Sequence, residues 1–237
     1  MKKIIAIAAI AALALSLAML SGCSTSTTSD VHYDDADKYS AGDAEFTDDV
    51  EKIAINYAAG DIRIEQTDGS KVTVKETAEK DLDEDEMIHT WLDGKVLRIQ
   101  YCASDKKIGI NGLEKKLTVS VPKNVELSDI EIDSGAGNVT FDRIVTSNMD
   151  IDLGAGDLDL IFTKIPKDAD IDLGAGDITI TMPEDSNITI DTDKGLGEIK
   201  SDIPFVNNKD DEEIVIGDGS NSLSIDMGAG DIAIKKL

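Results

Sequence analysis

Apolar and polar residues alternate along most of the chain, and the alternation shifts by one residue at regularly spaced glycines. Within residues 150–162 the apolar positions form two alternating runs: Ile151, Leu153 and Ala155, then Leu158, Leu160 and Phe162. A period of two predicts β-strands. The shift would turn the second strand inside out unless the backbone turned a corner between the runs. The pattern therefore predicts pairs of short strands joined at sharp corners.

One short phrase with two glycines recurs along the chain. Its copies span residues 132–139, 151–158, 171–178 and 225–232, with looser copies at 55–62 and 193–199. Most copies follow one another at about 20 residues, a spacing typical of stacked repeats. Glycine tolerates positive φ and close backbone contact, so we predict structural turns at Gly135, Gly137, Gly154, Gly156, Gly174, Gly176, Gly228 and Gly230. The small alanine between each pair is expected to point inward.

The repeating unit indicates the fold class. A unit of strand, corner, strand and polar turn is one rung of a solenoid, and rungs bury their inner faces only by stacking. We predict an all-β protein: a parallel β-solenoid, similar to a β-helix, with rungs of about 20 residues and a more irregular N-terminal β half. An antiparallel β-sandwich is the alternative. Residues 204–222 lengthen the gap before the last copy and are predicted to form a loop on one face.

The N-terminus has the pattern of a lipoprotein signal peptide over residues 1–22. A pair of lysines precedes a long apolar run, and Leu20-Ser21-Gly22-Cys23 resembles the lipobox of bacterial lipoproteins at all four positions. The resemblance implies cleavage before Cys23 and attachment of a diacylglycerol to its thiol, and two acyl chains make a stable anchor. An uncleaved membrane-spanning segment is the alternative. The predicted location is extracytoplasmic, with a lipid anchor in a bacterial membrane.

The rest of the chain divides by composition. Residues 23–45 are rich in Ser, Thr and Asp, and we predict a flexible tether with a reach of about 25 Å. His32 lies in this stretch, where a solvated side chain is the favoured interpretation. Residues 46–237 are predicted to form the solenoid domain.

The charge of the chain limits its partners. The 48 acidic and 23 basic residues give a net charge of −25, and aromatic residues make up only 4%. Such a surface repels the phosphates of nucleic acids and anionic lipid headgroups. We therefore expect no nucleic acid partner, and contact with the membrane only through the lipid on Cys23.

Stacking in register would place acidic residues in columns beside the glycine corners. Repulsion within a column could be relieved by bound cations, which makes weak calcium binding a hypothesis for Asp152, Asp157, Asp172, Asp177, Asp226 and Asp231. The favoured explanation is that these residues form turn hydrogen bonds and maintain solubility. No other metal site and no cofactor is predicted.

The sequence contains no catalytic constellation that we can recognise. Its histidines are His32 and His89, and no Ser/His/Asp or Cys/His arrangement suggests itself. Cys102 follows a strand-like run and is predicted to be a small buried hydrophobe. The chain is therefore predicted not to be an enzyme.

The chain resembles the bacterial adhesin-like family DUF4097. The resemblance rests on Ala59-Gly60-Asp61-Ile62, on Leu117-Thr118-Val119-Ser120-Val121-Pro122, and on the closing copy that ends at Gly230-Asp231-Ile232. It implies a β-solenoid surface protein and supplies no catalytic residues.

The predicted function is that of an adhesin-like binding or structural module of the cell envelope. Its partner would be an envelope or extracellular protein or polysaccharide. The alternatives are a carbohydrate-active β-helix enzyme and an accessory component of envelope stress sensing.

Overall fold

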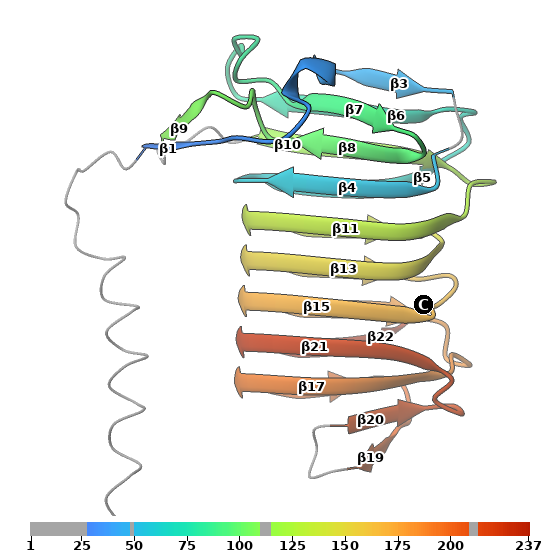
Figure 1. Ribbon diagram of the computed structural model, residues 1–237. Helices are drawn as coiled ribbons and strands as arrows, with labels where there is room; N and C mark the ends of the chain where they lie inside the picture. Colours follow the sequence, from blue (N-terminus) through green and yellow to red (C-terminus); the bar gives the residue numbers. More distant parts are fainter. Residues whose placement is uncertain (1–27, 48–49, 110–114, 209–212) are drawn as a thin grey trace, which may run out of the picture.

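Two large β-sheets make up most of the molecule (Figure 1). The computed structural model describes residues 28–47, 50–109, 115–208 and 213–237. The first sheet has 11 strands. In spatial order they are β19 (Val206–Asn208), β20 (Glu213–Ile216), β17 (Ile188–Leu196), β21 (Asn221–Ala229), β15 (Asp168–Ala175), β13 (Thr146–Ala155), β11 (Leu127–Ala136), β4 (Lys52–Tyr57), β8 (Val96–Gln100), β7 (His89–Asp93) and β2 (Ser40–Ala41).

The second sheet has 9 strands and lies across the core from the first. In order they are β18 (Ile199–Ser201), β22 (Ile232–Lys236), β16 (Ile178–Met182), β14 (Leu158–Ile161), β12 (Val139–Asp142), β5 (Asp61–Thr67), β10 (Lys115–Pro122), β6 (Val72–Ala78) and β3 (Ala44–Phe46). A separate pair joins β1 (Thr28–Asp30) to β9 (Lys107–Gly109), and a 3-10 helix, η1, spans Ala36–Lys38.

Each regular rung contributes one strand to each sheet. Neighbouring rungs pair in parallel and in register, so that Ile132 faces Ile151, Ile151 faces Ile171, and Ile171 faces Ile225. These isoleucines are buried between the sheets, while the residues next to them in each strand point outward. The predicted parallel β-solenoid is confirmed, and so is its more irregular N-terminal half, where β6 and β7 pair antiparallel with their neighbours.

The corners require glycine because backbones of successive rungs touch there. A Cβ on Gly156 would lie 2.0 Å from the carbonyl oxygen of Gly137, and Gly156 has φ +138°. A Cβ on Gly154 would lie 2.5 Å from the oxygen of Gly135. The expectation that the intervening alanine points inward was wrong. Ala155 is exposed because the chain turns outward between the two glycines.

The last repeat does not occupy the last position in the stack. Strand β21 lies between β15 and β17, and β22 lies between β16 and β18 (Figure 1). The inserted residues 204–222 were predicted to form a loop on one face. Instead they include β19 and β20, which pair antiparallel and extend the first sheet beyond β17. This excursion lets the chain return and place its final rung one position inward.

The predicted tether was too long. Strand β2 pairs with β7 and β3 pairs with β6, which joins residues 40–46 to both sheets. Aromatic contacts fix the segment further: the rings of Tyr39 and Trp91 lie 5.5 Å apart, edge to face. The folded part therefore begins before residue 46.

Candidate functional site

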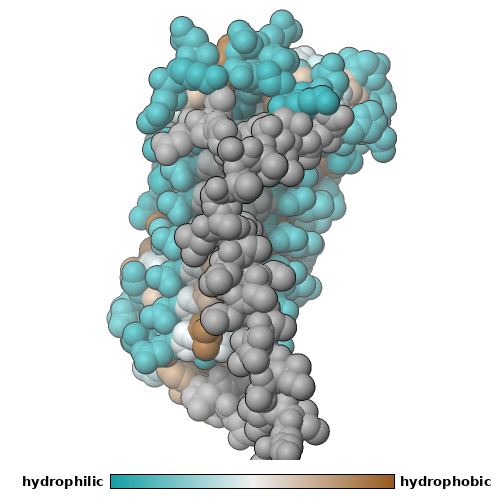
Figure 2. Space-filling view, turned by 90° about the vertical axis from the view of Figure 1, so that its left-hand side faces the viewer, coloured by the Kyte–Doolittle hydropathy of each residue, from teal (hydrophilic) through white to brown (hydrophobic). Residues whose placement is uncertain are grey.

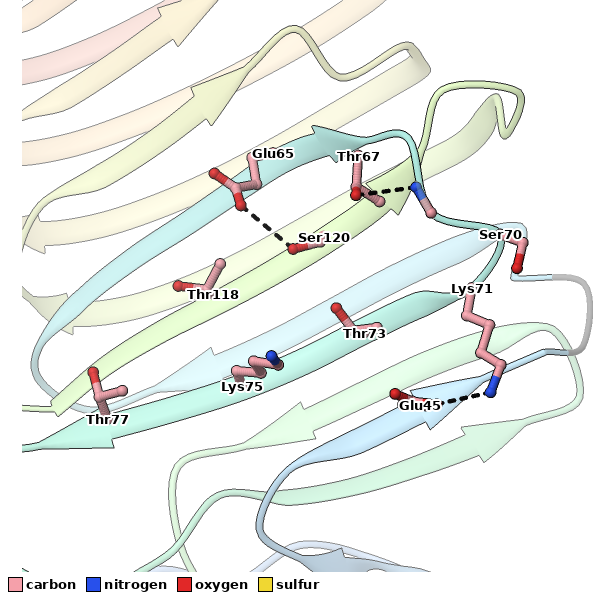
Figure 3. Close-up of a pocket in the computed structure, with 11 residues that line it drawn as sticks. Glu45, Glu65, Thr67, Ser70, Lys71, Thr73, Lys75, Thr77, Thr118 and Ser120 are labelled. Atoms are coloured by element: carbon pink, nitrogen blue, oxygen red, sulfur yellow. Dashed lines mark hydrogen bonds and ion pairs between the residues drawn. The ribbon is translucent and has the colours of Figure 1, made fainter.

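An open trough of about 550 Å³ lies on the outer face of the second sheet (Figure 3). It is formed by outward side chains of β3, β5, β6 and β10 and by the turn that follows β5. Its lining residues are mainly hydroxyl-bearing or charged: Glu45, Glu65, Thr67, Gly69, Ser70, Lys71, Thr73, Lys75, Thr77, Thr118 and Ser120. These side chains face outward because alternate residues of the same strands are buried in the core.

The charges of the trough are partly paired. Lys71 Nζ lies 2.8 Å from Glu45 Oε2, and this bond lowers the pKa of the Glu45 carboxyl. The Ser120 hydroxyl donates to Glu65 Oε1 at 3.4 Å. Lys75 lies on β6 directly opposite Thr118 of β10. Amines, hydroxyls and carboxylates spread along a shallow surface can hydrogen-bond an extended polar partner, whereas the lining includes no histidine or cysteine.

The outer face of the first sheet is acidic. Several outward columns in register contain carboxylates, as in the run Asp133, Asp152, Asp172, Asp226 and Asp193. Partial burial, and then the neighbouring carboxylates, raise the pKa of Asp172. The same causes, in the same order, raise the pKa of Asp150. Hydrophilic residues also cover most of the visible surface on the side of the molecule shown in Figure 2.

A second acidic column forms a hydrogen-bond ladder along the corners. Asn138 Oδ1 accepts from the Asp157 amide at 3.0 Å, and Asp157 Oδ1 accepts from the Asp177 amide at 3.0 Å. Asp177 Oδ1 then accepts from the Asp231 amide at 2.8 Å, and Asp231 Oδ1 from the Glu198 amide at 2.9 Å. Each polar side chain thus caps a backbone amide of the adjacent rung. This geometry supports turn hydrogen bonding at Asp157, Asp177 and Asp231.

The calcium hypothesis gains no support from the structure. Across the described ranges, no group of three or more His, Cys, Asp or Glu side chains is arranged to hold a metal ion. Asp152, Asp172 and Asp226 follow one another along a flat column in which each faces the next. Chelation needs several oxygens converging on one point.

A buried ion pair lies at the N-terminal end of the core. Lys115 Nζ lies 2.8 Å from Glu76 Oε1, and their side chains are 0% and 4% exposed. The ammonium also donates to the carbonyl oxygens of Glu86 and Tyr101, each at 2.6 Å, and lies 4.0 Å from the centre of the Tyr101 ring. Burial lowers the pKa of Lys115 and raises that of Glu76, while each charge opposes the shift of the other.

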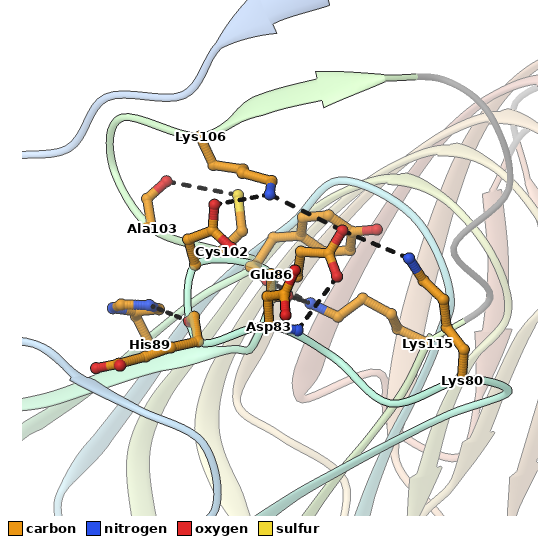
Figure 4. Close-up of polar contacts among 11 residues, drawn as sticks. Lys80, Asp83, Glu86, His89, Cys102, Ala103, Lys106 and Lys115 are labelled. Atoms are coloured by element: carbon orange, nitrogen blue, oxygen red, sulfur yellow. Dashed lines mark hydrogen bonds and ion pairs between the residues drawn. The ribbon is translucent and has the colours of Figure 1, made fainter.

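This ion pair holds the acidic loop before β7 against the core, through contacts to the backbone of Glu86 and Ile88. Figure 4 shows Lys80, Lys106 and Lys115 converging on Glu86. The Ile88 amide donates to Glu76 Oε2 at 2.9 Å. The site was missed in the sequence, although parity signals it: Lys115 has the same parity as the core residues Leu117 and Val119.

Cys102 is buried at the edge of this cluster, which confirms its predicted role as a small hydrophobe. Burial raises the pKa of its thiol, and its Sγ donates to the Ala103 carbonyl oxygen at 3.6 Å. His89 lies nearby, with Nε2 3.3 Å from the carbonyl oxygen of Glu84 (Figure 4). A neutral thiol is a poor nucleophile, so these residues do not form a recognisable reactive site.

The chain belongs to the Toastrack DUF4097 family. The family model matches residues 50–157 and again 124–235. This family match and the two-sheet solenoid together confirm the resemblance found in the sequence. A search of curated proteins found no match.

Solved structures share the architecture. A structure assigned as a cell adhesion protein from Clostridium sporogenes ATCC 15579 is 17% identical, covers 83% of this chain and 100% of its own, and has a TM-score of 0.62. One assigned as an adhesin from Bacteroides fragilis NCTC 9343 is 15% identical, covers 82% of this chain and 96% of its own, and has a TM-score of 0.34. At such low identity the first likeness shows the fold.

Cys23 and the predicted signal peptide lie outside the described residues. Among the residues that the structure does describe, none belongs to a helix long and apolar enough to cross a membrane.

Proposed function

We propose that this protein is an adhesin-like binding module of the bacterial envelope, anchored by a lipid on Cys23. The observation that carries the binding role is the trough on the second sheet. It is concave, its lining carries hydroxyls and lysines, and it lies on the second sheet, whereas the acidic columns lie on the first. Its partner would be an envelope or extracellular protein or polysaccharide that presents hydrogen-bonding groups along its length.

Three features support this role over catalysis. The trough is shallow and open, whereas enzymes usually enclose their substrates in a deeper pocket. Its carboxylates are engaged with neighbouring donors rather than aimed at a shared point. The related structure with the same fold is assigned to cell adhesion.

The anchor and the fold together would keep the domain near the membrane. Only residues 24–27 separate Cys23 from the first residue of β1. Even fully extended, the stretch from Cys23 to Thr28 spans at most about 18 Å. The domain would therefore lie close to the headgroups, nearer than a tether ending at residue 45 would hold it.

A Cys23→Ser variant tests the anchor. We expect the wild-type chain to incorporate a radiolabelled fatty acid and to sediment with membranes. The variant should incorporate no label and should stay unprocessed. Equal labelling of both chains would contradict lipidation at Cys23.

A matched pair of surface variants tests the trough. The double change Lys75→Glu and Thr118→Asp places negative charge in the trough, and both side chains point outward, so the core stays intact. Asp172→Asn on the opposite sheet is the control. Retention of the full-length protein on immobilised envelope polysaccharide and envelope protein fractions should fall several-fold for the trough variant alone. Equal retention of wild type and trough variant on both fractions would remove the trough as the contact surface.

A further inference from the structure

The rung formed by β21 and β22 fills an internal position although it follows both of its neighbouring rungs in the chain. Strand β21 pairs in parallel with β15 on one side and with β17 on the other. Strand β22 does the same between β16 and β18. Residues 221–237 therefore complete both sheets at once, between two rungs that precede them in the chain.

The rung formed by β17 and β18, which we call the cap, ends the second sheet, whereas β20 and β19 extend the first sheet beyond it. Thr192 faces Ile225, and Lys194 faces Met227, so polar residues stand where inner rungs have core residues. Lys194 Nζ reaches the carbonyl oxygen of Gly197 at 2.9 Å. Polar outer faces are typical of the terminal units of a repeat protein. The chain thus makes its cap before the rung that lies beneath it.

The final rung contributes a full set of core contacts. Its side chains Leu223, Ile225, Met227, Ile232 and Ile234 are each at most 2% exposed. Without them, the inner faces of the β15–β16 rung and of the cap would both lose a neighbour. While residues 221–237 are unfolded, the β15–β16 rung and the cap each lack one parallel neighbour. Their exposed strand edges can pair with this segment in the register seen in the structure.

A short turn connects this rung to the rest of the chain. Asn187 Oδ1 accepts from the Asp218 amide at 2.8 Å, and Asn221 Nδ2 donates to the Asn187 carbonyl oxygen at 2.6 Å. Gly217 and Gly219 in this turn have positive φ. The Thr189 hydroxyl also donates to the Gly219 carbonyl oxygen at 3.1 Å. This turn joins the segment to the preceding part of the chain, and its hydrogen bonds must open before the segment can leave its own stack.

We propose that residues 221–237 insert into the same position of a second copy, so that two chains exchange their C-terminal rungs. The segment of a second chain has the same sequence, so it can make the same contacts between the β15–β16 rung and the cap. Exchange preserves all of the parallel pairing and core contacts, which is what makes such swapping low in cost. The opposing factor is electrostatic, because each chain carries a net charge of −25.

Disulfide trapping between two variants tests the exchange. Asp172 and Asp226 are outward-facing partners on β15 and β21. Full-length chains carrying Cys23→Ser and either Asp172→Cys or Asp226→Cys are unfolded together, refolded under reducing conditions and then oxidised. We expect a disulfide-linked dimer on a non-reducing gel, in a yield that rises with salt because salt screens repulsion between the acidic chains.

The control uses two rungs that are neighbours in the stack and also consecutive repeats in the sequence. Asp152 and Asp172 are also outward-facing partners, on β13 and β15. A mixture of Asp152→Cys and Asp172→Cys chains should give several-fold less dimer, because exchange of the last rung does not bring these positions together.

The double variant Asp172→Cys/Asp226→Cys shows whether the disulfide can form within one chain. If it forms there while the mixed single variants give no more dimer than the control pair, the proposal is overturned. If it does not form, co-refolding of chains with two different affinity tags decides. Co-purification of both tags supports exchange, and their separate elution overturns it.

Discussion

Two corners in the same column of the solenoid, but in different rungs, are built in different ways. In the regular rungs, a glycine turns the chain and its backbone touches the glycine of the next rung, as Gly156 does with Gly137. In the rung made by β8 and β10, the corresponding place opposite Gly60 is taken by Lys115. Its side chain enters the core and is neutralised by Glu76.

The two corners differ in whether the same structure can recur in successive rungs. A glycine corner needs only backbone freedom, so it can be copied from rung to rung. The Lys115 corner depends on contacts from Glu76, Glu86 and Tyr101, which come from separate parts of the chain. Removing one partner from a buried charge pair leaves the other uncompensated. Removing one charge of the Lys115–Glu76 pair should therefore destabilise the N-terminal half. Adding a methyl group at a corner glycine should destabilise the regular rungs.

The largest effect should come from Gly156→Ala. Its Cβ would overlap the Gly137 carbonyl oxygen, and alanine at φ +138° is strained. We expect unfolding free energy to fall by about 4 kcal/mol. Urea denaturation measures the loss. The control Ala155→Ser, at the exposed residue of the same corner, should change it by less than about 0.5 kcal/mol. Equal losses for the two variants would mean that backbone contact does not define the corner.

Lys115→Met should cost somewhat less, about 3 kcal/mol, because Glu76 is left buried without its cation. Combining it with Glu76→Gln should recover part of the loss, since glutamine still accepts from the Ile88 amide and carries no charge. Urea denaturation of both single variants and the double variant forms a thermodynamic cycle. Additive losses would contradict a coupled pair.

The cost of Lys115→Met should depend on pH. Burial raises the pKa of Glu76, and Lys115 opposes that rise, so the variant should have a still higher Glu76 pKa. A carboxyl with a raised pKa in the folded state favours folding at low pH, and this contribution is lost as pH rises through the folded pKa. The difference in unfolding free energy between wild type and variant should therefore be smaller at pH 5 than at pH 8. A difference that grows on acidification would contradict a raised pKa for Glu76 in the folded state.

Asp177→Ala should have a smaller effect, about 1 kcal/mol, because it removes the acceptor for the Asp231 amide. Asp177→Asn should be close to neutral, since Asn138 fills the same role in another rung. Thermal unfolding of the two variants separates hydrogen bonding from charge. If asparagine were as harmful as alanine, the ladder would depend on the carboxylate charge.

Asp172→Asn should have the smallest effect, a slight rise in Tm at neutral pH. Partial burial and neighbouring carboxylates raise the pKa of Asp172, so its ionised form is disfavoured in the folded protein. The stability associated with this group is present at low pH and is lost as pH rises through the folded pKa. The gain in Tm should therefore shrink as pH falls to 4 and as salt is added. A gain that persists in both conditions would point to a cause other than charge.

Much of the regular half could be predicted from the sequence, because local patterns specify it. The parity shift at residues 151–158 predicts two strands and a corner, and recurrence of the phrase predicts stacking. The register of Asp152 with Asp172 follows from aligning the copies. The outward direction of Ala155 was not predicted, because parity alone does not specify how far the chain bends between two glycines.

The order of the rungs and the trough required the structure. The regular copies at 151–158 and 171–178 present inner residues similar to those of the copy at 225–232, so sequence alone does not specify which of them this copy pairs with. The trough joins β3, β5, β6 and β10, which pair across long stretches of chain. Lys115 did leave a signal in its parity with Leu117, but its partner Glu76 lies on another strand and nothing in the local sequence identifies it.

Native-state hydrogen exchange, measured amide by amide, tests the contrast between the two kinds of corner most directly. The amides of Asp157, Asp177 and Asp231 each donate to a side chain of the adjacent rung. We predict that they exchange as slowly as the core amide of Ile151, through unfolding of the whole stack, and that Lys115→Met accelerates only the Ile88 amide and its neighbours. Corner amides that exchange rapidly while Ile151 stays protected would contradict the account.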